Sequence, residues 1–251
     1  MSNKKKLNVL GVEVNTETME ETAKAIVRAM EGDKPTTVYT PNSEIIYHAY
    51  NNPEYMEILN RGDFVTPDGV GVIYASRILK RPIDERVSGY DLANAVLGKI
   101  KGTNKKVYLF GGKPGVAQKA AGKILKLYPG INICGAENGY FDEEREKKII
   151  ADIKEKAPDL LFVCLGFPKQ EQWIDAHKDE LGARVIMGLG GSLDVFAGEV
   201  KRAPEYMQKS GLEWFYRLVK QPSRATRMSA LPKFGFTVLF HGKDYLEDKG
   251  E

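Results

Sequence analysis

Short apolar runs alternate with longer amphipathic stretches along most of this chain. Residues 107–110, 160–165 and 185–189 are apolar at consecutive positions, which is typical of strands buried on both faces. In residues 19–30 and 143–156, apolar side chains recur every three or four positions, which predicts helices that bury one face. This alternation of strands and helices favours an α/β fold with a mostly parallel sheet flanked by helices.

The same reasoning predicts the remaining elements. Residues 7–14 are expected to form one strand that leads into the helix of residues 19–30. The other expected elements are strands at residues 36–40, 63–66 and 131–138 and helices at residues 43–50, 70–79, 90–100, 114–129 and 169–178. Together they predict an α/β body that spans residues 1–200.

The pattern changes beyond Gly198. An aromatic stretch, LEWFYRLVK, is followed by a basic stretch with two prolines, QPSRATRMSALPK, and then by the apolar run FGFTVLF. Residues 201–251 are therefore interpreted as a C-terminal appendage, basic and rich in aromatic residues.

Charge is distributed unevenly between body and appendage. The 251 residues are 42% hydrophobic and carry a net charge of +3, which is ordinary for a globular protein. Within residues 201–233, eight basic residues oppose Glu205 and Glu213, a local charge of +6 that leaves −3 on the rest. This asymmetry indicates an anionic partner: a membrane surface, a phosphate-bearing ligand or nucleic acid. The eight basic residues are Lys201, Arg202, Lys209, Arg217, Lys220, Arg224, Arg227 and Lys233.

Polar or glycine-rich segments follow six of the expected strands. Parallel strands end at one edge of the sheet, where ligands of open α/β sheets bind, so we expect these segments to form one site. Glycine lets a ligand approach the backbone, and helix N-termini offer N–H donors to phosphate. The residues concerned are Thr40, Asn42, Asp68, Gly111, Gly112, Asn138, Tyr140, Gly166, Gln170, Gln172, Gly188, Gly190 and Gly191.

Each candidate also has a plain structural interpretation. Asp68, between proline and glycine, is either a catalytic or ligand-binding acid or the cap of the helix that follows. Arg86 either meets phosphate or forms a surface salt bridge with Asp84 or Glu85. Thr40 or Asn42 could cap the next helix, and Gln170 could be an exposed helical residue.

Several known motifs are missing from the sequence. GGKPG is not a Walker A loop, and no glycine cluster completes a dinucleotide fingerprint. No cysteine and histidine spacing suggests zinc, and no Asp-x-Asp is present to clamp a metal on a sugar nucleotide. Lysine or arginine would then neutralise a bound diphosphate. Cys134 and Cys164 are interpreted as buried residues of a reducing compartment, so a cytoplasmic protein is expected.

Seven segments in this order resemble one known family, the WecG/TagA/CpsF glycosyltransferases, also called glycosyltransferase family 26. They are YTPNSE, VTPDGVGV, RVSGYD, LFGGKPG, NGYF, LGFPKQEQW and GLGGSLDVFAG, and the resemblance covers roughly residues 7–200. The resemblance implies transfer of a sugar from a UDP-sugar to a polyprenyl-diphosphate-linked N-acetylglucosamine (GlcNAc), with no metal or other cofactor. It also implies an α/β fold and a basic C-terminal segment that meets the membrane.

The TagA branch looks most similar, which refines the implied reaction. This branch transfers N-acetylmannosamine (ManNAc) from UDP-ManNAc, with inversion, onto undecaprenyl-diphosphate-GlcNAc in wall teichoic acid synthesis. By motif, Asp68 is implied as the base or as a group that orients the acceptor, Thr40 and Gln170 line the substrate site, and Arg86 meets phosphate. The full set expected to bind substrate is Thr40, Asn42, Arg86, Gly111, Gly112, Tyr140, Gln170, Gly190, Arg217, Arg224 and Arg227.

Other functions stay open at this point. Within the family, the donor could be a uronic acid derivative, UDP-ManNAcA. A nicotinamide-dependent oxidoreductase would also suit a doubly wound sheet, although the glycine fingerprint is missing. A nucleic-acid-binding module could use the basic appendage, although its aromatic residues suit a lipid interface better. The expected location is the inner face of the plasma membrane, bound peripherally at an anionic surface. The sequence leaves self-association into a homo-oligomer open.

Overall fold

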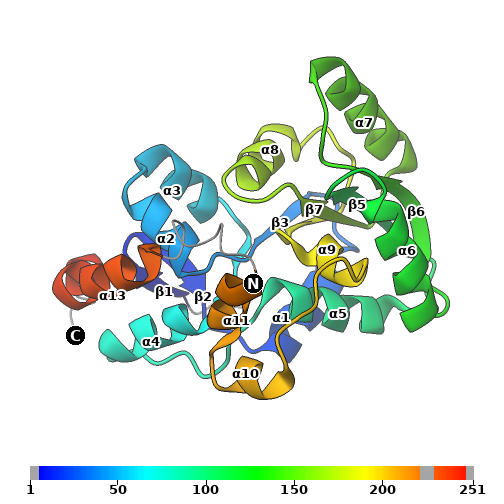
Figure 1. Ribbon diagram of the computed structural model, residues 1–251. Coiled ribbons are helices and arrows are strands. Elements are labelled where there is room, and N and C mark those ends of the chain that lie inside the picture. Colours follow the sequence, from blue (N-terminus) through cyan, green and yellow to red (C-terminus); the bar gives the residue numbers. More distant parts are fainter. Residues whose placement is uncertain (1–5, 221–228, 247–251) are drawn as a thin grey trace.

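Six parallel strands form the centre of the molecule in the computed structural model, which describes residues 6–220 and 229–246. Their order across the sheet is β4-β3-β8-β7-β5-β6, and every neighbouring pair is parallel. The strand β8 comes last of these strands along the chain but lies between β3 and β7. Figure 1 shows the helices arranged around the strands of this sheet. The strands are β3 (Thr36–Tyr39), β4 (Phe64–Val65), β5 (Lys106–Gly111), β6 (Asn132–Glu137), β7 (Leu160–Cys164) and β8 (Val185–Gly188). The predicted mostly parallel α/β sheet is confirmed.

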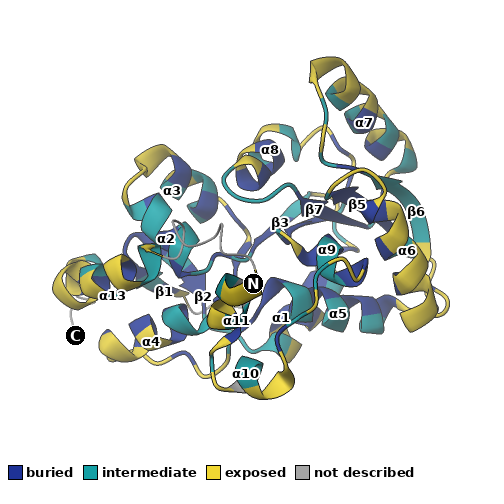
Figure 2. Cartoon of the chain, in the orientation of Figure 1, coloured by how far each residue is buried: buried dark blue, intermediate teal, exposed yellow. Residues whose placement is uncertain are grey.

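Both faces of this sheet are covered, which explains why its central strands are apolar at every position. Tyr108 and Phe110 pack into one hydrophobic core, whereas Val107 and Leu109 pack into the other. One face carries α1 (Met19–Ala29), α5 (Gly89–Ile100), α6 (Val116–Leu127) and α9 (Ser192–Phe196). The other core contains residues of α2 (Ser43–Tyr50), α3 (Pro53–Asn60), α4 (Val70–Ile78), α7 (Glu143–Lys156) and α8 (Lys169–His177). Figure 2 shows the buried stripe of these helices turned inward.

The N-terminal segment corrects one prediction. Residues 7–14 do not form a single strand, because β1 (Lys6–Val9) and β2 (Val12–Asn15) pair as an antiparallel hairpin outside the main sheet. Leu10 and Gly11 both have positive φ, 53° and 91°, as a type I′ turn requires. The Asn8 side chain accepts a hydrogen bond from the Gly11 N–H at 2.7 Å and stabilises this turn. The helix α3, which begins at Pro53, was not predicted.

The appendage packs against the body. It contains α10 (Glu205–Lys209), α11 (Glu213–Lys220), α13 (Ala230–His241) and a 3₁₀ turn, η2 (Gly242–Tyr245). Phe234 and Val238 of α13 are buried in the core that also contains residues of α2 and α4, whereas Phe236 and Phe240 are exposed. No helix within the described residues is long and apolar enough to cross a bilayer. The division into units at residues 1–200 and 201–251 stays a prediction.

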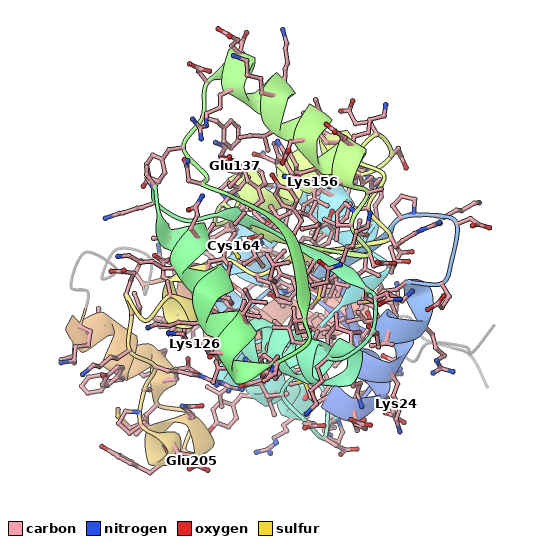
Figure 3. All side chains as sticks on the ribbon, turned by 90° about the vertical axis from the view of Figure 1, so that its right-hand side faces the viewer. Lys24, Lys126, Glu137, Lys156, Cys164 and Glu205 are labelled. Carbon is pink, nitrogen blue, oxygen red and sulfur yellow. The ribbon has the colours of Figure 1, made fainter. Side chains whose placement is uncertain are left out.

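Figure 3 views the molecule from the side of β6, an edge strand of the sheet. Cys164 lies in the interior and is buried, as expected. Cys134 is only half-buried because β6 has a neighbouring strand on one side alone. Neither cysteine forms a disulfide.

Candidate active site

The loops that follow β4, β3 and β8 contact one another at the carboxyl edge of the sheet. The Asp68 N–H donates to the Pro41 carbonyl at 3.3 Å. The Thr40 hydroxyl donates to the Gly188 carbonyl at 3.0 Å. A Cβ atom at Gly89, the first residue of α5, would come within 2.8 Å of the Thr40 hydroxyl. Thr40 therefore lies where three loops and the start of α5 meet.

The loops that follow β8, β7, β5 and β6 continue this series of contacts. The Gln170 side-chain oxygen accepts from the Gly190 N–H at 2.7 Å. The Gly112 N–H donates to the Cys164 carbonyl at 3.1 Å, and its own carbonyl accepts from the Gly139 N–H at 2.9 Å. All six loops thus meet along one edge of the sheet, as the sequence predicts.

Asp68 does not cap the helix that follows it. The N-cap of α4 is Gly69, at φ 90°, and no side chain caps this helix. The Asp68 Oδ2 atom instead accepts from the Gly89 N–H at 3.3 Å, across to the start of α5. The Val87 N–H donates to the Pro67 carbonyl at 3.1 Å and holds the two segments together. The interpretation of Asp68 as a helix cap is therefore wrong.

Asn42 is the residue that caps α2. Its side-chain oxygen accepts from the Ile45 N–H at 3.1 Å, and Thr40 takes no part in this cap. The capping interpretation thus holds for Asn42, and Thr40 is engaged with β8 instead.

Gln170 belongs to a buried polar group rather than to an exposed helix face. It is 3% exposed, and its Nε2 donates to Glu171 Oε1 at 2.8 Å. The Tyr55 hydroxyl donates to the other Glu171 oxygen at 2.9 Å. Burial raises the pKa of Glu171, although hydrogen bonds from its own backbone, Tyr55 and Gln170 oppose this effect. Sequence reasoning missed this pair, because Tyr55 lies 116 residues from Glu171 and outside the family segments, although Glu171 itself lies in LGFPKQEQW.

The expected glycine and tyrosine positions differ in their surroundings. A Cβ atom at Gly111 would collide with the Cys164 carbonyl, and its φ is 134°, so the fold itself requires glycine there. At Gly190 the Cβ position faces open space. Gly112 has φ 72° and lies over the first turn of α6. Tyr140 is 64% exposed and lies in the loop after β6.

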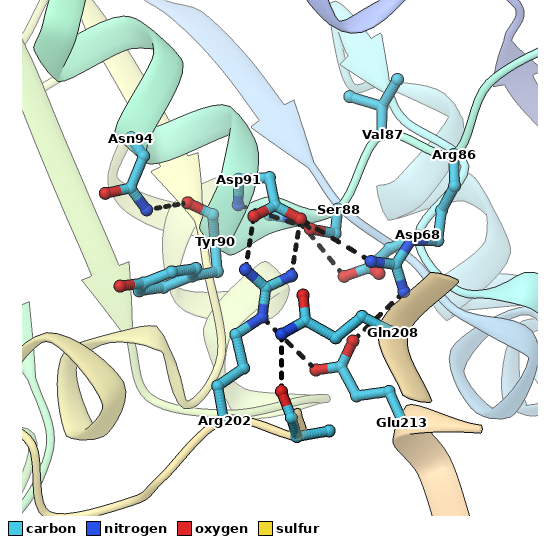
Figure 4. Close-up of polar contacts among 12 residues, drawn as sticks. Asp68, Arg86, Val87, Ser88, Tyr90, Asp91, Asn94, Arg202, Gln208 and Glu213 are labelled. Atoms are coloured by element: carbon cyan, nitrogen blue, oxygen red, sulfur yellow. Dashed lines mark hydrogen bonds and ion pairs between the residues drawn. The ribbon is translucent and has the colours of Figure 1, made fainter. Parts of the chain in front are cut away.

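Arg86 does not pair with its sequence neighbours. Its Nη1 donates to Glu213 Oε2 at 3.2 Å, and its Nη2 lies 3.7 Å from Asp91 Oδ2. Glu85 accepts instead from the backbone N–H of Met19. The expected salt bridge with Asp84 or Glu85 is therefore wrong, and Arg86 connects α5 to the appendage (Figure 4).

Arg202 was not expected in the site, although its charge is part of the basic segment. Its guanidinium donates to both Asp91 oxygens, at 2.5 and 2.6 Å, and lies 5.0 Å from the centre of the Tyr90 ring. Burial would raise the pKa of Asp91, but hydrogen bonds from Arg202 and Ser88 outweigh it and hold that pKa below its usual value. Asp91 is the last residue of the RVSGYD segment. This segment is the one sequence signal that could have identified the Asp91–Arg202 pair.

Three expected arginines cannot be placed. Arg224 and Arg227 lie outside the described residues, and Arg217 belongs to α11, but its side chain is not among those described. Among the described residues, no group of histidine, cysteine, aspartate and glutamate could hold a metal ion.

A groove of about 290 Å³ adjoins Arg86. One wall is the α4 helix, which contributes Val70, Ile73, Tyr74 and Arg77, and the other includes Gln208 and Gly211 of the appendage. The edge of the sheet can therefore offer a carboxylate, hydrogen-bonding side chains and a cation beside a partly apolar groove.

Comparison with known proteins gives consistent matches. The model of the glycosyl transferase WecG/TagA/CpsF family matches residues 7–246. A protein of Bacillus spizizenii is 38% identical over 213 residues, which cover 84% of this chain and 82% of the relative. A protein of Staphylococcus aureus strain MW2 is 35% identical over 239 residues, which cover 94% and 93%. Each is named N-acetylglucosaminyldiphosphoundecaprenol N-acetyl-beta-D-mannosaminyltransferase.

Proposed function

This chain belongs to the WecG/TagA/CpsF family of glycosyltransferases, and from this premise we propose that it transfers ManNAc from UDP-ManNAc to undecaprenyl-diphosphate-linked GlcNAc. The similar proteins of B. spizizenii and S. aureus carry a name that describes this transfer. The reaction is inverting and serves the linkage unit of wall teichoic acid.

The observation that carries this proposal is the meeting of six loops at one edge of the sheet. Thr40 contacts the last residue of β8, Gly188, and Gln170 contacts Gly190 in the loop that follows. The Asp68 carboxylate lies on the same side, bound to the start of α5. A sugar donor and an acceptor hydroxyl can be held there between groups from different strands, as ligands are in open α/β sheets.

The proposed chemistry is a single displacement. The acceptor hydroxyl attacks C1 of the donor sugar, the bond from C1 to the UDP oxygen breaks, and UDP leaves with the bonding electrons. Asp68 takes the proton of the attacking hydroxyl as general base. Cationic side chains of the appendage stabilise the charge on the leaving diphosphate, and Arg86 meets a phosphate group of the substrates. Asp68 acting only to orient the acceptor is the alternative role.

Substitution of Asp68 tests its proposed role. Asp68→Asn should reduce turnover by about 10²–10⁴, because a general base contributes that much. The fold should persist, because Asn can keep one oxygen toward the Gly89 N–H. Asp84→Asn, at an exposed carboxylate in the loop before Arg86, is the matched control and should leave turnover unchanged. A folded Asp68→Asn variant with near-normal turnover would show that Asp68 only orients or supports the loop.

The donor and the absence of a metal requirement can be tested in one assay. We expect transfer from UDP-ManNAc onto a lipid-linked GlcNAc, and activity that survives EDTA. A preference for UDP-ManNAcA would instead favour the uronic acid alternative. Loss of activity in EDTA that Mg²⁺ or Mn²⁺ restores would contradict chemistry without a metal. We find no observation that favours an oxidoreductase or a nucleic-acid-binding function.

The lipid acceptor also sets the proposed location. Its undecaprenyl tail stays in the bilayer, so the enzyme must work at the cytoplasmic face of the membrane. We propose that the basic appendage binds anionic lipid headgroups there, because each lysine or arginine near such a surface contributes roughly 1 kcal/mol. Self-association into a homo-oligomer stays open and can be measured by analytical ultracentrifugation.

A further inference from the structure

Glu213 is a largely buried carboxylate that the transfer mechanism above does not use. Its side chain is 11% exposed, and it lies between Arg86 at 3.2 Å and Arg202 at 3.8 Å. We propose that Glu213 occupies the position of the acceptor's diphosphate, and that Arg86 and Arg202 together bind this diphosphate once Glu213 has moved away. The identity of the acceptor rests on the proposed function.

The two guanidinium groups form a site that suits phosphate. Figure 4 shows both pointing toward the carboxylates of Asp91 and Glu213. The donors of a guanidinium bind carboxylate and phosphate oxygens alike, so a phosphate oxygen can take the place of a Glu213 oxygen. Glu213 comes from the appendage, 127 residues from Arg86, whereas Arg86 and Asp91 belong to the body.

A second observation concerns Arg202 Nε, a buried donor with no hydrogen-bond acceptor among the described residues. Its 3.8 Å approach to Glu213 Oε1 is an ion pair but too long for a hydrogen bond. A buried donor left unsatisfied is costly, and a diphosphate oxygen closer than the Glu213 carboxylate would satisfy it. Glu213 therefore satisfies the hydrogen-bond donors of Arg86 and Arg202 only in part.

Asp91 explains how Arg202 can stay in place when Glu213 leaves. The bidentate Asp91–Arg202 pair does not involve Glu213, and the Ser88 hydroxyl holds Asp91 at 2.5 Å. The cation is therefore fixed to the body by α5. Only the first turn of α11, which carries Glu213, has to shift for the site to become available.

The neighbouring groove favours the lipid acceptor over the nucleotide donor. Arg86 lies at a groove whose α4 wall presents the apolar residues Val70, Ile73 and Tyr74 together with a second cation, Arg77. The opposite wall approaches closely at Gly211, where a Cβ atom would lie 2.8 Å from Val70. An amphiphile with a diphosphate and an apolar tail matches two cations beside a row of apolar side chains. A nucleotide, polar along its length, matches it less well.

Binding of farnesyl diphosphate to the full-length chain, measured by calorimetry, tests this inference. Glu213→Gln keeps the size of the side chain but removes the competing charge. We expect the dissociation constant for farnesyl diphosphate to fall about 5-fold or more, with that for UDP unchanged. Glu205→Gln, an exposed carboxylate on α10, is the matched control for charge and should change neither value. Unchanged or weaker farnesyl diphosphate binding by Glu213→Gln, or equal tightening of UDP, would overturn the proposal.

Arg202 supplies a second arm of the same experiment. Placed in the Glu213→Gln chain, Arg202→Gln should weaken farnesyl diphosphate binding about 5-fold or more, while UDP binding persists. Persistent UDP binding serves as the check on folding, and unchanged farnesyl diphosphate affinity excludes Arg202 from the site.

Kinetics separate this inference from the proposed function. If both hold, Glu213→Gln lowers the KM for the lipid acceptor and leaves the KM for UDP-ManNAc unchanged. Tighter farnesyl diphosphate binding in a chain that transfers no ManNAc would support the arginine site and reject the proposed sugar. ManNAc transfer with an unchanged acceptor KM in Glu213→Gln would reject the inference alone.

Discussion

The amide of Gln170 is oriented by two neighbours at once. Its oxygen accepts from Gly190 and its nitrogen donates to Glu171, so a flipped amide would place like groups together on both sides. Glu171 in turn is held by Tyr55. These contacts make Glu171 and Tyr55 positioning residues for a side chain at the candidate site.

Tyr55→Phe tests this orientation. Loss of one hydrogen bond to a buried carboxylate should lower the free energy of unfolding by about 1–3 kcal/mol. If the orientation matters, the KM for UDP-ManNAc should also rise, because Gln170 contacts the loop after β8. Tyr206→Phe, at an exposed tyrosine, is the control in a melting and kinetic comparison. A loss of stability with unchanged kinetics would assign Tyr55 to the core alone.

Asp91 gives a prediction about pH. Its pKa is lowered in the folded protein, so the stability that it contributes is fully present above its unfolded pKa of about 3.9. This contribution is lost as the pH falls through the folded pKa. Asp91→Asn should lower the free energy of unfolding by about 1–2 kcal/mol at pH 7, a value reduced by partial solvent exposure.

Urea titrations of both proteins at several pH values measure this effect. The difference between wild type and Asp91→Asn should shrink as the pH falls below 4. A difference that stays constant down to pH 3 would mean that the Asp91 charge is not its source.

At the level of elements, α13 has two different faces. Phe234 and Val238 face the body, whereas Phe236, Leu239 and Phe240 are 57–71% exposed. Apolar side chains beside a basic segment are typical of helices that lie in a membrane interface. We therefore propose that the outer face of α13 contributes to membrane binding, besides the basic charge of the appendage.

Leu239→Asp tests this contribution. Binding to phosphatidylglycerol vesicles in a sedimentation assay should weaken about 10-fold, because the variant loses buried apolar area and places a negative charge at an anionic surface. Leu127→Asp on α6, at a leucine of similar exposure, is the matched control and should bind as wild type does. Equal effects of the two substitutions would reject a specific role for α13.

The elements also explain how far sequence reasoning could go. The strands at residues 107–110, 160–165 and 185–189 were predicted because burial on both faces leaves a continuous apolar run. The hairpin at Leu10 and Gly11 was missed because this turn lacks the Asn-Gly signal and the flanking residues suit one strand equally well.

For the candidate site too, sequence reasoning predicted some contacts and missed others. Thr40 and Gln170 could be placed near each other, because parallel strands end at one edge whatever the details of packing. Arg202 and Glu213 could not be placed in this way, since their contacts depend on how the appendage packs against α5. Such packing follows from side-chain fit between distant segments, which a single sequence does not display.

For the whole molecule, removal of residues 201–251 separates the roles of body and appendage. The truncated chain should keep the circular dichroism of the parallel sheet but melt earlier, because the core loses Phe234 and Val238. It should also lose vesicle binding and most transfer activity.

A full-length control distinguishes charge from packing in that result. Combined substitution of Arg217, Arg224 and Arg227 by glutamate leaves Phe234 and Val238 in the chain, yet should abolish vesicle binding. If the truncated chain binds anionic vesicles as well as the full chain does, the appendage is not the membrane anchor.

The central place of β8 has a consequence for the order of events on the ribosome. Until residues 184–188 have emerged, no backbone hydrogen bond of the described sheet joins the β3–β4 pair to the group of β5, β6 and β7. Nascent chains fold from the N-terminus onward, so this protein passes through a stage with two unjoined half-sheets, each with an open edge. Thr40 and Gln170 belong to different halves, and the end of β8 with the loop after it links them, through Gly188 and Gly190. A chain arrested before Arg184 therefore lacks the assembled candidate site, and the sheet and this site are completed together when β8 joins the two halves.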